Sequence, residues 1–581
     1  MKRLLLLVLC AAGGAAADEG GFCLPDKPCW PSAAEWQKLR AAVGGRLVQP
    51  ELPFAHCIVD LKSAECATEI QNLKNPFFIQ DQPGGTESLG WLGAWNAAPS
   101  AYAVAADSPA DVAAAVNFAR EHGLRLVVKG TGHDYLGRSN APGSLLLWTH
   151  AMRQIQSHDA FVPKGCTRAG IPAVSLGAGT RWLEAYQEVT IKHGRYVQGG
   201  GCTSVGAAGG FLQGGGFGTW SKKYGIAAAG LLEAEIVTAD AKILIANACQ
   251  NQDLFWALRG GGGGTFGVVT RATLMTHPLP ETFGFVDGSI QANSEKAFTE
   301  LVERFLVFYH QSLSNEHWGE QVKLRGNNTM VISLVTQGLH ASEMEAIWKP
   351  FRQWVDERPR DYTMKAQFGE IPAAKVWDTA FFAAMAPDAI RRDSLDASRF
   401  WWAGDADQVA TYWYAYQSRW VPAELFAPAR AKAFAQVLVA ASRHWSVGFH
   451  FNKGQAGASE EALKRDRETS MNPDVLRSAA LVIVASSGGG HPSVRGREPD
   501  QKEGEEQRAR VSAAMKLIRE ATPGSGSYVN ETDYFEPDWK RSFWGPNYAK
   551  LLAIKHKYDP TGLFTCHHCV GSDEPRPKRG E

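Results

Sequence analysis

The chain has 581 residues, of which 45% are hydrophobic and 21% charged, and its 60 basic residues balance its 60 acidic ones. This length exceeds the size at which one hydrophobic core stops growing, so we expect at least two domains of ordinary globular composition. Because the net charge is zero, the sequence lacks the basic surface that nucleic-acid or anionic-membrane partners require, which argues against both.

The N-terminus has the pattern of a secretory signal peptide. A basic start at Lys2 and Arg3 precedes an apolar run over residues 4–12 and small residues up to Ala17. We expect removal of residues 1–17 and a secreted or periplasmic protein; the alternative is an apolar N-terminus that stays attached. No later apolar run approaches the length of a membrane span.

The cysteines predict disulfide bonds. Without Cys10, which leaves with the signal peptide, an odd number of thiols remains, and an exported protein tends to pair them. The predicted pairs are Cys23–Cys29, Cys57–Cys66, Cys566–Cys569 and, less directly, Cys166–Cys249. Cys202 is left unpaired. Zinc at Cys566-His-His-Cys569 is an alternative, but it needs two further ligands that the neighbouring sequence does not supply. We therefore predict no metal site.

A first β-α-β unit follows an N-terminal extension (residues 18–95) that contains one helix near residues 33–43. Residues 102–105 have strand character, and Ser108-Pro109 places an N-cap and a first-turn proline before a helix that Gly123 ends. A second strand over 124–129 then leads into a loop, Gly130-Thr-Gly-His-Asp-Tyr135.

A second such region extends from about residue 173 to residue 277. It is predicted to contain a helix near 182–193, a strand at 232–238, a short helix at 253–258 and a strand at 268–274. Glycine-rich runs at 199–218 and 260–267 separate these elements. Beyond Pro278 the pattern changes to amphipathic helices and strands with many aromatic residues, so a second domain begins there.

Three glycine-rich loops, at 130–137, 199–218 and 260–267, therefore lie where elements meet. Glycine allows backbone N–H groups to approach a ligand and form an anion-binding concavity, so we expect a large, phosphate-bearing cofactor. Glycine-padded crossings of a sheet are the alternative. Residues 262–267 formally satisfy G-x-G-x-x-G, but they follow a helix and open a strand. A nicotinamide-binding fingerprint requires the opposite order, so that interpretation is rejected.

His133 and Cys202 stand out within these loops. His133 lies in the first loop directly after a strand, and the unpaired Cys202 lies in the second. Imidazole and thiolate are nucleophiles able to attach an organic cofactor covalently. A histidine or cysteine with a purely structural role is the alternative.

Long motifs carry a resemblance to a known family. They are Val128-Lys-Gly-Thr-Gly-His-Asp-Tyr-Leu-Gly-Arg-Ser139, Cys202-Thr-Ser-Val-Gly206, the run from Asp253 to Gly267, Phe543-Trp-Gly-Pro-Asn-Tyr548 and Lys557-Tyr-Asp-Pro-Thr-Gly-Leu-Phe564. The chain resembles the vanillyl-alcohol oxidase and p-cresol methylhydroxylase (PCMH) superfamily of FAD proteins. Within it, the chain is most similar to the berberine bridge enzyme-like branch, and to secreted proteins of the isoamyl alcohol oxidase type.

The resemblance implies an α+β architecture. A PCMH-type FAD-binding domain of two α/β subdomains (96–278) would precede a substrate domain with an antiparallel sheet covered by helices (279–530). A berberine bridge-like C-terminal segment (531–571) and a tail (572–581) would follow.

The resemblance also implies that FAD is joined at its 8α-methyl carbon to His133 and at C6 to Cys202. The other residues that it places around FAD are Gly130, Thr131, Gly132, Asp134, Gly137, Arg138, Ser139, Ser204, Val205, Gly206, Gly209, Gly210, Gly214, Gly215, Gly216, Gly264, Thr265, Phe266, Gly267, Val268 and Asn547.

The expected activity is oxidation of an alcohol, sugar or related small organic substrate, with hydride passing to flavin N5 and O2 reoxidising the flavin. His450 and Tyr135 are candidate bases, and Asn547 is a candidate for orienting substrate or flavin. Trp544 replaces the tyrosine usual in the family's C-terminal motif and has no ionisable proton. The alternatives are a dehydrogenase that uses another electron acceptor, a non-catalytic flavin- or carbohydrate-binding secreted protein, and a zinc hydrolase.

Overall fold

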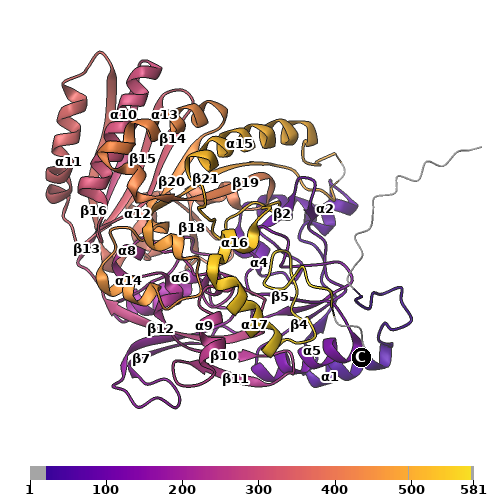
Figure 1. Ribbon diagram of the computed structural model, residues 1–581. Helices are drawn as coiled ribbons and strands as arrows, with labels where there is room; N and C mark the ends of the chain where they lie inside the picture. Colours follow the sequence, from indigo (N-terminus) through magenta and orange to yellow (C-terminus); the bar gives the residue numbers. More distant parts are fainter. Residues whose placement is uncertain (1–20, 495, 577–581) are drawn as a thin grey trace, which may run out of the picture.

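A computed structural model describes residues 21–494 and 496–576 (Figure 1). The predicted signal peptide lies outside these residues. Within them the chain forms two smaller sheets, in the lower part of Figure 1, and one large sheet with its helices in the upper part. A further two-stranded sheet pairs β17 (Ile390–Arg392) with β18 (Phe400–Trp402). This mixed α+β arrangement agrees with the predicted fold class.

The first small sheet contains the predicted β-α-β unit. Its strands, in spatial order, are β1 (Leu47–Val48), β4 (Tyr102–Ala105), β6 (Leu145–Trp148) and β5 (Leu126–Lys129). Between β4 and β5 lies α5 (Pro109–His122), whose N-cap Ser108 accepts a hydrogen bond from Asp111 N. Gly123 ends α5 at φ 65°, a left-handed conformation that favours glycine. The local sequence signals are therefore confirmed, and β5 delivers the chain into the first glycine loop.

The second small sheet carries the other two glycine loops. Its strands are β11 (Ile243–Asn247), β10 (Leu231–Val237), β12 (Val268–Pro278), β8 (Ile171–Gly177) and β7 (Ile155–Phe161), and β9 (Arg195–Val197) also pairs with β12. The predicted helix near 182–193 is α6 (Trp182–Tyr186), which continues as a π-helix over Gln187–Lys192. The short helix α9 (Gln252–Ala257) precedes the third glycine loop and β12 follows it. The order expected for this loop is confirmed.

The large sheet has nine strands. In spatial order they are β16 (Tyr362–Pro372), β13 (Thr282–Ala292), β15 (Thr329–Gln337), β14 (Trp318–Arg325), β20 (Val447–His450), β21 (Ser478–Gly488), β19 (Thr411–Pro422), β2 (Ser88–Trp91) and β3 (Trp95–Asn96). The helices α10 (Glu295–Phe308), α11 (Ala341–Asp356), α13 (Pro428–His444) and α15 (Gln501–Ala521) share a hydrophobic core with its strands. They gather at one end of the molecule (Figure 1).

The N-terminal extension contributes to both halves of the molecule. Its helix α1 (Ala33–Ala42) packs near α5, and β1 pairs with β4. Its later part, after α4 (Pro76–Gln80), forms β2, which pairs in parallel with β19. This crossing brings residues 80–88 beside the first glycine loop, where Glu87 N donates to Gly132 O at 3.0 Å.

The C-terminal segment returns to the glycine loops. It contains α16 (Trp539–Trp544) and α17 (Tyr548–Tyr558). The buried Lys555 donates from Nζ to Thr265 O at 2.7 Å, and it also pairs with Asp559. The C-terminal segment therefore packs against the third glycine loop and is hydrogen-bonded to it.

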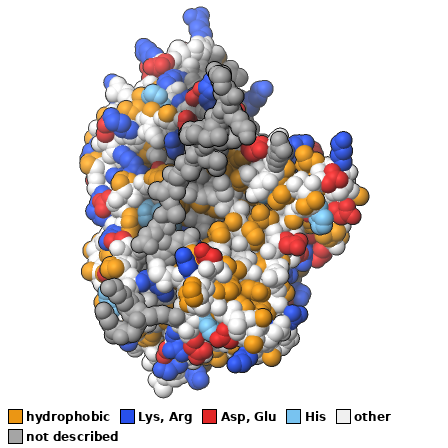
Figure 2. Space-filling view, turned by 90° about the vertical axis from the view of Figure 1, so that its right-hand side faces the viewer, with side chains coloured by type: hydrophobic (Ala, Val, Ile, Leu, Met, Phe, Trp, Pro, Cys, Tyr) orange, Lys and Arg blue, Asp and Glu red, His pale blue; other side chains and the backbone are white. Residues whose placement is uncertain are grey.

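All four predicted disulfides are present, and Cys202 is the free cysteine among the described residues. The bonds are Cys23–Cys29, Cys57–Cys66, Cys166–Cys249 and Cys566–Cys569. On the face seen in Figure 2, basic and acidic side chains are interspersed. Among the described residues, no helix has the length and apolar character needed to cross a bilayer.

Candidate cofactor and active site

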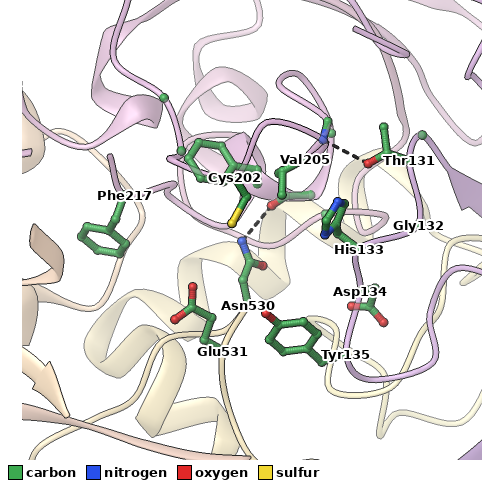
Figure 3. A pocket seen from close by; sticks show the side chains of 18 of the residues that line it. Thr131, Gly132, His133, Asp134, Tyr135, Cys202, Val205, Phe217, Asn530 and Glu531 are labelled. Atoms are coloured by element: carbon green, nitrogen blue, oxygen red, sulfur yellow. Dashed lines mark hydrogen bonds between the residues drawn. The ribbon is translucent and has the colours of Figure 1, made fainter. Parts of the chain in front are cut away.

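A cavity of about 860 Å³ lies between the glycine loops and the large sheet. This volume is in the range of sites that hold a cofactor or a drug-sized ligand. Residues 130–141, 199–202 and 263–264 line one side, and the C-terminal residues 528, 530 and 531 approach from another. Figure 3 shows His133, Cys202, Tyr135, Asn530 and Glu531 around one space.

The first two glycine loops are held against each other at the cavity wall. Gly206 N donates to Thr131 Oγ1 at 3.0 Å (Figure 3), and a Cβ at Gly206 would lie 3.2 Å from that oxygen. Gly132 has a φ of 85°, which favours glycine, and its carbonyl accepts from Glu87. Downstream, Arg138 N donates to Asp134 at 2.7 Å and closes the loop.

At several glycines the backbone faces the cavity without a side chain. This feature shows whether the site fits a phosphate-bearing cofactor. A Cβ built at Gly201, Gly209 or Gly210 meets no protein atom within 4 Å, so packing within the protein does not require these glycines. All three line the cavity. Exposed backbone without side chains is what close approach of a dinucleotide needs, so the cavity fits FAD.

His133 is fixed by hydrogen bonds on one ring nitrogen. Its Nε2 lies 3.0 Å from Ser204 Oγ and 3.0 Å from the amide nitrogen of Gln80. That amide nitrogen already donates its two hydrogens, to Glu87 Oε1 at 2.9 Å and to Ser204 O at 3.0 Å. Gln80 cannot be flipped, because its oxygen accepts from Arg181 Nε at 2.9 Å.

The proton on His133 is therefore assigned to Nε2. Gln80 has no third hydrogen to give, and the carboxyl oxygen Oε1 of Glu87 lies 3.5 Å from Nε2, which favours an N–H at this position. We therefore assign the ring hydrogen to Nε2, with the Ser204 hydroxyl, which can donate or accept, as its acceptor. Burial lowers the pKa of His133 to about 3, so the ring is neutral. Its Nδ1 then bears the free lone pair, as a nucleophile requires.

Cys202 is half-buried and protonated. Burial raises the pKa of its thiol well above the ordinary value, and the neighbouring Asp405 raises it further. Burial likewise raises the pKa of Asp405 to about 6, while its hydrogen bond with Cys202 opposes that rise. Asp405 therefore lies beside this thiol in the cavity wall.

Carboxyl groups on the other cavity wall were missed by the sequence analysis. Besides Asp405, Glu320 and Glu531 line the cavity. Glu320 has a φ of 69°, an uncommon conformation for a non-glycine residue, and it accepts from Thr219 Oγ1 at 2.5 Å. Burial raises the pKa of Glu320. No motif marks these residues, and strain at position 320 is not visible in a sequence.

Glu531 is paired with a cation and with a phenol. Lys453 forms an ion pair with its carboxylate, and Tyr416 donates to the same oxygen at 3.4 Å. Burial and then Glu531 raise the pKa of Tyr416 well above its ordinary range. The Glu531 carboxylate, the Tyr416 hydroxyl and the Lys453 ammonium group thus lie together at the cavity wall.

The two predicted bases also line this cavity. Tyr135 donates from its hydroxyl to Gln408 Oε1 at 2.9 Å, and burial raises its pKa well above the ordinary value. His450 ends β20, and burial, then Lys453 and Lys323, lower its pKa well below the ordinary value. A histidine with so low a pKa is a weak base.

Asn547 is placed elsewhere. Its side-chain amide donates to Met471 O at 2.8 Å, and it lines a separate cavity of about 270 Å³ beside Asp466. The structure gives it no contact with the large cavity, because the chain turns away into α17 after Trp544. Trp544 itself is buried and donates to Gly260 O.

The predicted cofactor residues divide into two groups. Those that line the large cavity are Gly130, Thr131, Gly132, His133, Asp134, Gly137, Arg138, Ser139, Cys202, Val205, Gly206, Gly209, Gly210, Gly264 and Gly267. Those that do not border it are Ser204, Gly214, Gly215, Gly216, Thr265, Phe266 and Val268. Ser204 reaches the site through His133. Gly214, for example, is covered by Asn530, which a Cβ would strike at 2.4 Å.

Metal ligands do not cluster in the described part of the chain: no three or more His, Cys, Asp or Glu side chains there are placed to hold a metal ion.

Comparison with known proteins places this site in a family. A family model described as FAD binding domain matches residues 99–247, and one described as berberine and berberine like matches residues 527–571. A VAO-type flavoprotein oxidase of Thermothelomyces thermophilus is 30% identical, over 95% of this chain and 92% of its own. The chain belongs to the VAO-type FAD-linked oxidoreductases. The family and fold indicated by the glycine-loop motifs are thereby confirmed.

Another relative and two solved structures are also similar to this chain. An FAD-linked oxidoreductase of Arthroderma benhamiae is 30% identical, over 95% of this chain and 94% of its own. The solved VAO-type flavoprotein of Myceliophthora thermophila C1 superposes with a TM-score of 0.79 at 27% identity, covering 95% of this chain and 97% of that one. A glucooligosaccharide oxidase of Acremonium strictum, whose FAD is 6-S-cysteinyl and 8α-N1-histidyl, shares the fold at 20% identity and a TM-score of 0.65, over 90% of this chain and 99% of that one.

Proposed function

We propose that this VAO-type enzyme holds FAD by two covalent bonds, from His133 Nδ1 to the 8α carbon and from Cys202 Sγ to C6. One observation carries the proposal: a neutral imidazole with a free Nδ1 and an unpaired thiol border the same glycine-lined cavity. The paired linkage in the Acremonium strictum oxidase supports it. Two bonds would fix the ring relative to the substrate wall.

The reaction that we propose is oxidation of a small organic alcohol, sugar or related C–H donor. When bound, the flavin accepts hydride and transfers the electrons to O2. The cavity wall contains aromatic side chains that would pack against an apolar part of the substrate. They are Tyr186, Tyr196, Trp220, Phe283, Trp377, Phe382 and Trp402.

Glu531 is the proton acceptor that we favour for the substrate hydroxyl. Lys453 pairs with its carboxylate, and Tyr416 presents a hydroxyl beside it. Burial lowers the pKa of His450 well below its ordinary value, which makes it a weak base, and raises the pKa of Tyr135, which keeps its phenol protonated. We retain His450 and Tyr135 as substrate-positioning groups.

Export is part of the same proposal. The four disulfides of the described residues suit an oxidising compartment, which is where a signal peptide over residues 1–17 would deliver the chain. Secretion would be tested by comparing the N-terminus of exported protein with that of the full chain.

Oxygen consumption tests the proposed activity. Purified protein would be assayed against a panel of alcohols and sugars, with and without an artificial electron acceptor. We expect O2 consumption and equimolar H2O2 with at least one substrate. Turnover only with the artificial acceptor would instead identify a dehydrogenase, and no turnover despite bound flavin would favour a binding protein. A colourless protein that contains metal would overturn the proposal.

A further inference from the structure

Glu87 is a buried carboxyl that the proposed reaction does not use. It lies just before β2, its side chain is 2% exposed, and its Oε1 is 3.5 Å from His133 Nε2. Its other oxygen, Oε2, has no hydrogen-bond partner among the described residues. Leaving a buried carboxyl oxygen unpaired is costly, so this placement needs a compensating role.

Hydrogen bonds hold Glu87 beside the imidazole of His133. Its backbone N–H donates to Gly132 O at 3.0 Å, which fixes it to the residue before His133. Gln80 donates to Glu87 Oε1 at 2.9 Å and is itself oriented by Arg181. The carboxyl and the ring nitrogen are therefore held in one network.

We propose that Glu87 is the positioning residue that receives the Nε2 proton of His133 when the covalent bond to FAD forms. This inference rests on the proposed attachment of FAD to His133. Ser204 Oγ also accepts from Nε2, at 3.0 Å, but a neutral hydroxyl does not retain a proton as a carboxylate does.

The linkage reaction balances with Glu87 in this role. Nδ1 of His133 forms a bond to the 8α-methyl carbon, while one C–H bond of that methyl group and the Nε2–H bond of the ring break. The electron pair and both protons end on the isoalloxazine ring, with Glu87 holding the imidazole proton in transit. O2 then takes the electron pair and both protons from the ring and becomes H2O2, so that overall one N–C bond replaces one N–H bond and one C–H bond.

The charges around Glu87 suit a group that exchanges a proton near neutrality. Burial raises its pKa to about 7, while its hydrogen bond from Gln80 and the cations Arg181 and Lys74 oppose the rise and Asp405 adds to it. His133, whose pKa is lowered to about 3, stays neutral over the same range. Lys129, with a pKa lowered by burial to about 7, and Asp405, with a pKa raised to about 6, also line the cavity. The part of the pH dependence that Glu87→Gln removes is therefore the part that belongs to Glu87.

The test is the rate of covalent FAD incorporation into apo-protein. A Cys202→Ala background leaves His133 as the sole proposed attachment point, and FAD that remains with acid-precipitated polypeptide is measured over time. We expect Glu87→Gln to slow incorporation at least about 10-fold, and Glu87→Asp to restore part of the rate. Asp466→Asn is the matched control, because Asp466 is also a buried carboxyl but lies beside the small cavity.

The pH dependence of the incorporation rate distinguishes a role of Glu87 in proton transfer from a purely structural role. With Glu87 present, the incorporation rate should rise as the pH increases through about 7, and Glu87→Gln should remove this dependence. Equal rates in Glu87→Gln and the Cys202→Ala parent would overturn the inference while leaving the tether intact. If Glu87→Gln does not fold, the Cys202→Ala parent decides alone: an incorporation rate that does not change between pH 6 and pH 8 would overturn the inference equally. A parent that retains no flavin after acid would instead contradict the proposed attachment.

Discussion

Trp544 donates a hydrogen bond from its indole Nε1 to the carbonyl oxygen of Gly260 at 2.9 Å. The bond ties the C-terminal segment to the third glycine loop, and the indole is fully buried. Trp544 therefore ties the C-terminal segment to the cofactor-binding half from outside the cavity.

Trp544→Phe should lower the stability of the protein more than its change in volume explains. The carbonyl of Gly260 would lose its partner, which costs on the order of 1–2 kcal/mol in addition to the packing loss. Trp348→Phe is the matched control, because Trp348 is also fully buried but its Nε1 has no hydrogen-bond partner within the described part of the chain. Denaturant unfolding of both variants measures the difference. Equal losses of unfolding free energy in the two variants would show that the hydrogen bond from Trp544 to Gly260 contributes nothing to stability.

Asp466→Asn should stabilise the protein at alkaline pH and not at acid pH. Burial raises the pKa of Asp466 from 3.8 to about 7, so its folded form binds a proton more tightly than its unfolded form does. The cost of burying the ionised carboxylate is therefore full above pH 7 and is lost as the pH falls toward 4. We expect a gain on the order of 2 kcal/mol at pH 8.

The free energy of unfolding, measured at pH 4.5 and pH 8 for Asp466→Asn and for the unmodified protein, tests this prediction. An Asn side chain still accepts the hydrogen bond that Ile226 N makes to Asp466 Oδ1 at 3.0 Å, so that contact is retained. A gain of the same size at both pH values would show that ionisation of Asp466 is not its cause.

Glu531→Gln should slow reduction of the flavin by substrate. If Glu531 accepts the hydroxyl proton, its loss should reduce the rate constant about 10²- to 10⁴-fold while substrate binding changes little. Stopped-flow bleaching of the flavin measures this step. His450→Gln and Tyr135→Phe should have smaller effects. A large loss in His450→Gln with near-normal rates in Glu531→Gln would transfer the role of base to His450.

Removal of the Cys166–Cys249 bond should destabilise the fold. The bond joins the loop after β7 to the turn after β11, strands at opposite edges of one sheet, and it closes 83 residues of chain. Such a loop predicts a loss of roughly 2–5 kcal/mol in the Cys166→Ser/Cys249→Ser protein. Thermal unfolding would test it, with Cys57→Ser/Cys66→Ser as the comparison, because that disulfide closes only 9 residues and a smaller loss is expected. An unchanged melting temperature would contradict the expectation.

Local chemistry explains which parts of the fold could be predicted from the sequence. Ser108-Pro109 and Gly123 set the ends of α5 through capping and left-handed backbone, which are properties of the chain itself. Close cysteine spacing likewise gave three of the disulfides. The glycine loops that line the cavity could be found for the same reason.

The acidic residues of the site could not be found in this way. Glu87 reaches His133 because β2 pairs with β19, a contact between segments more than 300 residues apart. Glu320 and Glu531 come from a strand and a C-terminal loop in which no motif surrounds them. Asn547 lies in a motif that resembles the family's, but its amide donates to Met471 O and it borders the small cavity, so its role stays a prediction.

The measurement that tests the double tether most directly is the distribution of flavin after acid precipitation, followed by mass mapping of proteolytic peptides. We predict that native polypeptide precipitates yellow and that the flavin mass lies on peptides containing His133 and Cys202. His133→Ala and Cys202→Ala should each retain one bond, and the double variant none. A white precipitate from the unmodified protein, with all of the flavin in the supernatant, would contradict the account.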